Sequence, residues 1–318
     1  MRPQLPPNPS VASLVRGQCD TVHPGNTGIA VFILLGYPRS GNTLLGAVLN
    51  ANDWIVIPDE TDFILPVCMV CQRVPNAHPG RKILANLIAN TERFDHSIGR
   101  YIRYAEIVRA LSQCEYSASA VVIAIHELVS RNAGKLIAGN RSPNDIAYVP
   151  DMAKAGLFDS DIKVVHLVRD PRDVYVSTRR LNWIPPEQLQ SELPGTWTAT
   201  NLMLARLLRN NLEQYLCVRY EDLISDPKRQ IQRITDFLGV PFQPKMLEAR
   251  TRSGLYEDQP HHANVGLEFL PSRIAAFRRE LSPGIADEIA ERASEGMNFF
   301  GYAKVVQTAF PKVRSAQC

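Results

Sequence analysis

The sequence lacks several features that would place it in a specialised class of protein. Its 35 Lys and Arg residues almost balance 32 Asp and Glu residues, so a net charge of +3 favours neither nucleic acid nor a membrane surface as partner. No apolar stretch is long enough to span a membrane, and residues 1–29 contain no stretch of signal-peptide length. Repeats and low-complexity tracts are also missing. These absences predict a soluble, cytoplasmic globular protein.

Cysteine is sparse, with six residues scattered over 318 positions. This pattern excludes a dense disulfide framework and a paired zinc motif. Cys68 and Cys71 form one CxxC, but no second pair or His-x-x-x-His accompanies it. Two packed thiols on a helix are therefore favoured over a metal or redox site, and we predict no metal.

Short apolar runs bounded by turn residues recur along the chain, with helical patterns between them. They predict strands at 30–36, 54–57, 135–139, 162–168 and 215–219. Runs that are nearly uninterrupted are typical of parallel strands buried on both faces. Ser142-Pro143 and Asp170-Pro171 each place an N-cap residue before a proline, which predicts helix starts directly after two of these strands.

The other segments complete the predicted organisation. Residues 61–133 show a helical pattern without a strand candidate, which indicates an insertion that caps a pocket. From about residue 241 the chain is irregular, and it is helical again at 272–280 and 284–295. We expect a flexible N-terminal arm over 1–29 and one domain over 30–318.

Residues 36–43, GYPRSGNT, fit the nucleotide-binding template G-x-x-x-x-G-K-[ST] except that Asn42 stands in place of the lysine. The segment follows a predicted strand and opens a predicted helix over 43–51. Backbone N–H groups at such a turn, with the positive end of the helix dipole behind them, bind a phosphate or similar oxyanion. Arg39 can supply the missing positive charge. The alternative is a strand–turn–helix connection that binds nothing.

The sequence YPRSGNTLL closely resembles the 5′-phosphosulfate loop of sulfotransferases that use 3′-phosphoadenosine 5′-phosphosulfate (PAPS), which reads P-[RK]-[SA]-G-[TN]-[TS]. The resemblance implies a P-loop NTPase-like three-layer α/β/α fold with a central parallel sheet of about five strands. It also implies transfer without a metal, because a sulfuryl group carries less negative charge than a phosphoryl group. The implied cofactor contacts are Arg39, Ser40, Gly41, Asn42, Thr43 and Leu44.

Two later segments carry the same resemblance. VVHLVRDPRDVYVST, residues 164–178, looks like the family's 3′-phosphate motif, which implies that Arg169 and Ser177 bind the phosphate on the ribose. An ion pair between Arg169 and Asp173 is the alternative. VRYEDLISDP, residues 218–227, matches the family's Y-E-[DQ]-L pattern and implies that Tyr220 lies near the nucleotide. The acids that follow it, Glu221 and Asp222, are expected to cap the next helix.

The catalytic base is predicted from a third resemblance. The cytosolic branch of the family uses a histidine after a K-T-H-type motif, but the corresponding segment here, IAGNRSPND, has none. WIVIPDETDF resembles the G-E-E-T-like motif of the branch that includes the tyrosylprotein sulfotransferases, at the same interval from Arg39. This resemblance implies that Glu60 is the general base, whereas a helix start at 59–61 is the alternative.

Arg141 stands where this branch usually has a lysine that contacts the bridging oxygen of the leaving group. Either Arg141 does this work, or it binds substrate and Arg39 alone serves the leaving group. His126 and His166 lie on apolar elements and are expected to be core residues, while His261-His262 could reach a pocket mouth. Candidates to complete the nucleotide site are Arg252-Ser253-Gly254, Arg273, Arg278 and Arg279.

The predicted function is transfer of the sulfuryl group from PAPS to a hydroxyl acceptor, with PAP as product. The expected acceptor is a small molecule, a lipid or a carbohydrate, bound by the insertion and by the Trp/Pro-rich stretch 182–197. A small-molecule kinase on the same scaffold is one alternative, although it would need the loop lysine and magnesium. A non-catalytic nucleotide-binding protein is the other. Neither the identity of the acceptor nor the oligomeric state follows from the sequence.

Overall fold

A computed structural model describes residues 30–249 and 268–302. The predicted N-terminal arm, Arg252-Ser253-Gly254 and His261-His262 lie outside the described residues. The sheet has five parallel strands in the order β2-β3-β1-β4-β5. Their bounds are β1 Ala30–Leu35, β2 Ile55–Val56, β3 Ile137–Arg141, β4 Lys163–Val168 and β5 Tyr215–Arg219.

All five predicted strands are confirmed, and β3 alone is displaced. It begins two residues later than predicted and runs on to Arg141. Leu136 is 36% exposed, whereas every residue from Ile137 to Arg141 is buried. The predicted apolar run therefore begins outside the sheet. The strand itself ends with polar residues that are buried against the neighbouring strands.

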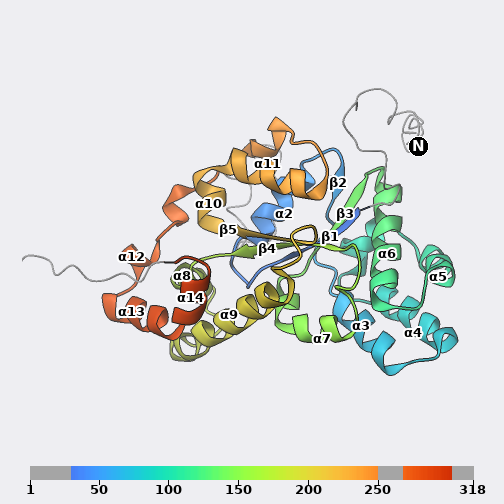
Figure 1. The fold of residues 1–318 in the computed structure, drawn as a ribbon, viewed down its shortest axis with the longest axis horizontal. Coiled ribbons are helices and arrows are strands. Elements are labelled where there is room, and N and C mark those ends of the chain that lie inside the picture. Colours follow the sequence, from blue (N-terminus) through green and yellow to red (C-terminus); the bar gives the residue numbers. More distant parts are fainter. Residues whose placement is uncertain (1–29, 250–267, 303–318) are drawn as a thin grey trace, which may run out of the picture.

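Alternation along β1 explains the layers of the fold. Phe32 and Leu34 point into one hydrophobic cluster with α2, α10 and α11, while Val31, Ile33 and Leu35 point into a second cluster with the remaining helices. Figure 1 shows the sheet between these two groups of helices. The predicted three-layer α/β/α architecture is confirmed.

The helices follow the strands in the pattern of crossover connections. Their bounds are α2 Asn42–Asn50, α3 Ile64–Arg73, α4 Ala77–Ala89, α5 Tyr104–Gln113, α6 Ala118–Ala133, α7 Val149–Lys154, α8 Pro171–Arg179, α9 Pro186–Leu208, α10 Tyr220–Ser225, α11 Pro227–Leu238, α12 Phe277–Glu280, α13 Pro283–Arg292 and α14 Ser294–Phe299. Ser142 and Asp170 occupy the N-cap positions predicted for them, and Asp170 accepts a hydrogen bond from the Arg172 N–H.

The insertion between β2 and β3 contains α3, α4, α5 and α6, with two short 3₁₀ turns and no strand, as predicted. These helices form one side of the molecule in Figure 1. The CxxC lies on α3, where Cys68 is fully buried in the larger hydrophobic cluster and Cys71 is half-buried. Both thiols are free, as expected for packed side chains.

Two predictions about the C-terminal half need correction. Residues 272–280 contain only a 3₁₀ turn, Pro271–Arg273, and the single α-helical turn α12, because Ala275 has a positive φ of 51° that interrupts the helix. The stretch 182–197 is not one loop, because α9 begins at Pro186. Pro185-Pro186 opens this helix, and Trp197 lies within it, fully buried.

No helix within residues 30–249 and 268–302 is long and apolar enough to cross a membrane. The topology also determines where a ligand can bind. Because β1 lies between β3 and β4, the loop that follows β1 lies between the carboxyl ends of both neighbours. Crevices at such a point are the usual ligand sites of open parallel sheets.

Candidate active site

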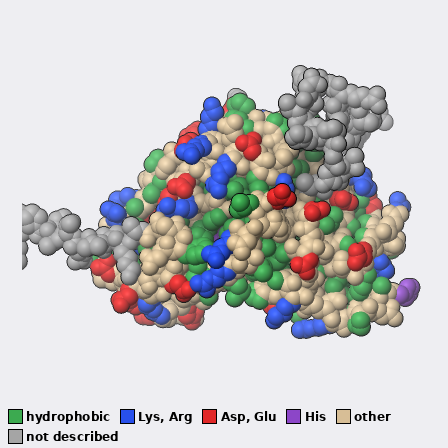
Figure 2. Space-filling model, in the orientation of Figure 1, with side chains coloured by type: hydrophobic (Ala, Val, Ile, Leu, Met, Phe, Trp, Pro, Cys, Tyr) green, Lys and Arg blue, Asp and Glu red, His purple; other side chains and the backbone are tan. Residues whose placement is uncertain are grey.

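A cavity of about 750 Å³ opens at this carboxyl edge of the sheet. Its lining comes from the loop after β1, the α8 region, the start of α10 and the segment before α12. The lining residues are Pro38, Arg39, Gly41, Asn42, Thr43, Leu44, Glu60, Arg93, Pro143, Asn144, Arg169, Asp173, Val176, Ser177, Arg180, Leu181, Trp183, Tyr220, Glu268, Leu270, Arg273 and Ala276. Five are arginines and three are acids, so the cavity is locally basic although the chain has little net charge. Figure 2 shows Lys and Arg side chains close together near the middle of one face.

Asn42 explains how the loop can do without a lysine. Its side-chain amide donates hydrogen bonds to the carbonyl oxygens of Gly36, at 3.0 Å, and Tyr37, at 3.3 Å. The residue is buried and ties the start of the loop to the start of α2. Asn42 therefore has a structural role in closing the loop.

The loop exposes its backbone to the cavity through an unusual conformation. Arg39 and Gly41 both have positive φ, at 69° and 103°. A Cβ at Gly41 would lie 2.7 Å from the ring of Tyr220, so this position requires glycine. Helix α2 then begins without a side-chain cap, and its first residues line the cavity. The unsatisfied N–H groups of a helix start are well suited to bind an oxyanion.

Arg39 and Arg169 bring positive charge to the same place. The Nε of Arg39 donates to Ser177 Oγ at 3.2 Å, and Arg169 Nη1 donates to the Arg39 carbonyl at 3.1 Å. Burial lowers the pKa of Arg39, and the nearby charge of Arg169 lowers it further. Two cations held together in a partly buried place favour an anion between them. The structure thus brings Arg39, Arg169 and Ser177 together, although they are far apart in the sequence.

Arg169 is held from several sides. Its guanidinium lies 4.3 Å from the centre of the Tyr220 ring, and Trp197 Nε1 donates to its carbonyl oxygen at 3.1 Å. No ion pair joins Arg169 to Asp173 among the described residues, and the two oxygens of Asp173 accept backbone hydrogen bonds from Ala275 and Phe277. The Nε of Arg169 is buried and lacks a hydrogen-bond partner in the described part of the chain.

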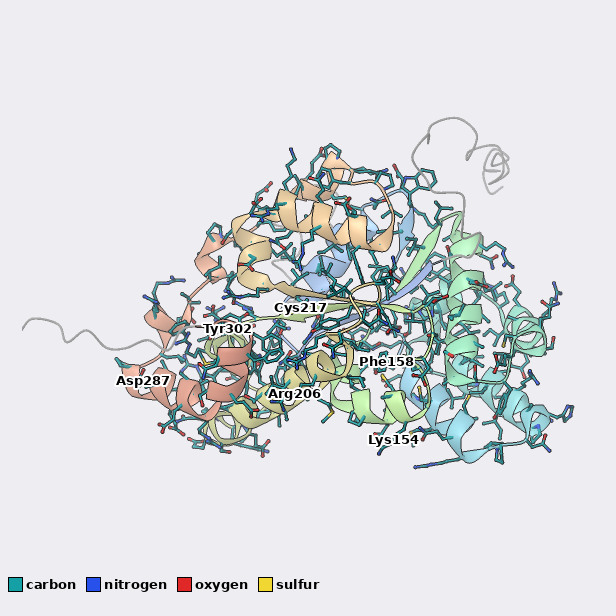
Figure 3. All side chains as sticks on the ribbon, in the orientation of Figure 1. Lys154, Phe158, Arg206, Cys217, Asp287 and Tyr302 are labelled. Atoms are coloured by element: carbon teal, nitrogen blue, oxygen red, sulfur yellow. The ribbon has the colours of Figure 1, made fainter. Side chains whose placement is uncertain are left out.

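Glu221 does not cap its own helix as expected. Its carboxylate accepts from the Asp170 N–H at 3.0 Å and from the hydroxyl of Tyr302 at 2.8 Å, and burial raises its pKa. Tyr302, labelled in Figure 3, lies close to the β5 edge of the sheet. Glu221 thus links the turn after β4 to the C-terminal part of the fold, a contact that a local cap motif does not reveal.

Glu60 lies in the cavity lining with both carboxylate oxygens engaged. Oε1 accepts from Arg141 Nη1 at 3.1 Å and Oε2 accepts from Arg93 Nη1 at 3.2 Å. Arg141 also donates to Asp59 at 2.5 Å and to Thr43 at 3.2 Å. The segment 59–60 is therefore joined to the first turn of α2 through one arginine.

Arg141 lies beneath the cavity and is not in its lining. Its side chain is 1% exposed and passes Gly46 of α2, where a Cβ would lie 2.8 Å from Arg141 Cδ. The side chain of Arg93, in contrast, is 48% exposed. One arginine thus fixes Glu60 from below, and the other contacts it from the solvent side.

The two segments predicted to form an acceptor pocket contribute unequally. Of the insertion, Arg93 lines the cavity, whereas Leu181 and Trp183 line it from the turn between α8 and α9. Trp183 is 67% exposed and follows Asn182, whose φ is 53°. Asp59, Arg93 and Arg180 were not predicted as site residues. The sequence carries little sign that these residues belong to a site, because each is a charged residue in a turn or at a helix end, where charge is common.

Asp145 is a buried acid close to the site. Burial raises its pKa from 3.8 to about 8, and the charges of Asp62 and Glu60 act in the same direction. Its Oδ2 has no hydrogen-bond partner among the described residues. Between pH 4 and 8 the folded protein therefore binds a proton at Asp145 that the unfolded chain has released. Stability contributed by this group is lost as the pH rises through this window.

We expect Asp145→Asn to remove this pH dependence, because an amide has the same shape but no titration. The free energy of unfolding of the variant, minus that of the wild type, should grow by about 1.4 kcal/mol per pH unit between pH 5 and 8. Urea unfolding at a series of pH values measures it. If the free energy of unfolding depends on pH in the same way in both proteins, folding does not raise the pKa of Asp145.

The two core histidines are as predicted. His166 bonds Tyr215 through Nδ1 at 2.7 Å and Asn201 through Nε2 at 2.9 Å, and His126 Nδ1 lies 2.8 Å from the Val122 carbonyl. Both rings are fully buried, and burial lowers the pKa of each to about 4. Neither lines the cavity, so they belong to the core.

Comparison with known proteins agrees with this geometry. The model of a family described as "Sulfotransferase family" matches residues 31–244, which include the segments 36–43, 164–178 and 218–227. A Caenorhabditis briggsae protein named "Putative protein-tyrosine sulfotransferase" is 26% identical over 237 residues, covering 73% of this chain and 69% of its own. Human carbohydrate sulfotransferase 2 is 30% identical over 128 residues, or 27% of this chain.

This chain spans 40% of the length of mouse sulfotransferase 2B1 and 24% of that of carbohydrate sulfotransferase 2. Because relatives from differently named groups match, assignment to the glutamate-base branch stays a prediction.

The fold has counterparts among solved structures. The sulfotransferase domain from the Synechococcus PCC 7002 olefin synthase superposes with a TM-score of 0.59 at 23% identity, covering 88% of this chain and 98% of that domain. The sulfotransferase domain from the curacin biosynthetic pathway gives a TM-score of 0.56 at 19% identity. At this level of identity the likeness concerns the fold. With the family match over residues 31–244, we conclude that the chain belongs to the sulfotransferase family.

Proposed function

We propose that this protein transfers the sulfuryl group of PAPS to a hydroxyl acceptor. One cavity is lined by both a cluster of basic residues and a carboxylate, and this observation carries the proposal. Arg39 and Arg169 lie at the anion site, and Glu60 lines the same cavity. Such an arrangement provides both charge stabilisation and a proton acceptor, which transfer to an alcohol or phenol requires.

The residues present fit a bisphosphorylated nucleotide. The unpartnered Arg169 Nε and the uncapped start of α2 offer donors to anions. Burial lowers the pKa of Arg39 and the charge of Arg169 lowers it further, and a bound anion would offset both effects. We assign the phosphosulfate to residues 39–44 and the 3′-phosphate to Arg169 and Ser177, with Tyr220 beside the nucleotide.

PAPS, when bound, supplies an activated sulfuryl group whose leaving group is the 5′-phosphate of PAP. The role of Glu60 is to accept the acceptor's hydroxyl proton at Oε2, the oxygen paired with the half-exposed Arg93, while the buried Arg141 orients the carboxylate through Oε1. Arg39 stabilises negative charge on the leaving oxygen, because it lines the cavity and Arg141 does not. We therefore assign Arg141 a positioning role, in place of direct contact with the leaving group.

The acceptor site lies between Glu60 and the turn after α8. Its lining mixes charged and polar groups, Arg93 and Asn144, with apolar ones, Leu181 and Trp183. This mixture supports a small hydroxylated molecule, a lipid or a carbohydrate as acceptor.

The test is a thermal shift with PAP. At a hundredfold excess over its Kd, PAP should raise the Tm by roughly 4–8 °C, because it binds the folded state alone. Adenosine 5′-monophosphate, which lacks the 3′-phosphate, is the matched control and should give a much smaller shift. Stabilisation by ATP with magnesium and none by PAP would support the kinase alternative and overturn the proposal. PAP binding without sulfation of any hydroxyl compound in a broad screen would support the non-catalytic alternative.

A further inference from the structure

Residues 270–277, which we call the C-terminal strap, cross the cavity beside the turn after β4. Leu270, Arg273 and Ala276 of the strap line the large cavity. Ile274, Ala275 and Phe277 line a second, smaller cavity of about 210 Å³ on the other side. The strap thus contributes residues to the linings of both cavities.

Three hydrogen bonds tie the strap to residues 169–173. Arg169 Nη2 donates to the Arg273 carbonyl at 2.9 Å. The carboxylate of Asp173 accepts from the Ala275 N–H at 2.8 Å and from the Phe277 N–H at 2.9 Å. The positive φ of Ala275, 51°, turns the chain so that both N–H groups converge on one carboxylate.

Asp173 is suited to hold the strap in place. It is 1% exposed, and burial raises its pKa while Arg169 and the two backbone N–H groups lower it. Beside it, the guanidinium of Arg172 lies 4.0 Å from the centre of the Phe277 ring and is held by a bidentate pair with Asp170. Every charged residue of the RDPRD segment, 169–173, therefore contacts the strap or supports a residue that does.

This arrangement distinguishes the three candidate arginines of the nucleotide site that lie among the described residues. Arg273 lines the large cavity, Arg278 lines the small one, and Arg279 donates to the Ser272 carbonyl near the surface. Arg273 alone among them lines the same cavity as Arg39 and Arg169.

We propose that Asp173 is a positioning residue for Arg273, holding the strap so that this arginine completes the anion site. The inference rests on the proposed function, because it concerns the same nucleotide. The residues that bind the 3′-phosphate and those that fix the strap then come from one short segment, so assembly of the site depends on Asp173.

The test is a double-mutant cycle with PAP as ligand, measured by titration calorimetry. Arg273→Gln should weaken PAP binding about ten- to hundredfold through loss of one charge-assisted contact, and Asp173→Asn should weaken it about tenfold. The double variant should bind no more weakly than Arg273→Gln, because Asp173 acts through Arg273. Fold-changes that multiply in the double variant would overturn the inference.

Salt dependence gives a readout that a general loss of stability would not change. Each single variant should reduce the slope of log Kd against log salt concentration, because salt screens the attraction between a cation and a phosphate and one such contact has been lost. An unchanged slope for Asp173→Asn would contradict the proposal. Arg278→Gln is the matched control, and its Kd for PAP should equal that of the wild type.

The outcomes separate the two proposals. If the wild-type protein fails to bind PAP, the proposed function falls and the inference with it. If the wild type binds PAP and the fold-changes in Kd of the two single variants multiply in the double variant, the inference alone is wrong. Asp173→Asn retains the size of the side chain and one acceptor oxygen, so we expect it to fold, and thermal unfolding checks this.

Discussion

Glu60→Gln is expected to lower kcat for sulfuryl transfer by about 10²–10⁴-fold while the Kd for PAP stays within about twofold. Glutamine keeps the shape of the side chain and can still accept hydrogen bonds from Arg93 and Arg141, but it does not take up the acceptor's proton. The measurement is product formation from PAPS with phenol, sterol and sugar acceptors, together with PAP calorimetry. Loss of both sulfuryl transfer and PAP binding would indicate that Glu60 has a structural role.

The matched control for this prediction is Glu268→Gln. Glu268 lines the same cavity as Glu60 but is exposed and belongs to the segment that leads into the strap. We expect it to change kcat by less than about tenfold. If Glu268→Gln stops transfer and Glu60→Gln does not, the base has been assigned to the wrong carboxylate.

Arg141→Met is expected to lower the free energy of unfolding by about 2–4 kcal/mol and to impair transfer. Methionine fills much of the space but leaves Asp59, Glu60 and Thr43 without their shared donor. Loss of one partner from a buried ion pair is strongly destabilising. The two carboxylates are 27% and 19% exposed, so water compensates part of the loss. Urea unfolding and PAPS turnover measure the two effects.

Arg141→Lys separates charge from geometry at the same position. A lysine can reach fewer of the three oxygens that the planar guanidinium now contacts. We expect it to restore most of the stability and only part of the kcat. Full activity with lysine would show that Arg141 acts as a point charge, as the lysine of the related branch does, and would weaken the positioning role.

The strands and the anion loop could be predicted because local chemistry specifies them. Strands buried on both faces read as uninterrupted apolar runs, and β1, β4 and β5 lie close to their predicted bounds. The loop 36–41 needs glycine at fixed positions and a strand and helix around it, which a sequence displays directly. Asp170-Pro171 likewise predicts the start of α8.

The contacts that complete the site could not be predicted, because they join residues distant in sequence. Arg93 reaches Glu60 across 33 residues, and Asp173 reaches the strap across more than 100. A charged residue in a turn gives no sign of which carboxylate it will meet. The helix at 186–208 was missed because the prolines near its start and at 194 read as loop signals, although Pro is compatible with a first helical turn.

By itself the sequence determined the strands, the strand–loop–helix segment at 36–43 and, through the resemblance of its motifs, the family, because periodicity, turn residues and motif spacing are properties of short segments. Only the tertiary structure decided the work of individual side chains. It showed that Asn42 closes the loop, that Arg141 lies beneath the cavity and that Asp173 holds the strap. The physical reason is that burial and hydrogen-bond partners are set by packing between distant segments. The same residue type can bind a ligand or support the fold, and its surroundings decide which.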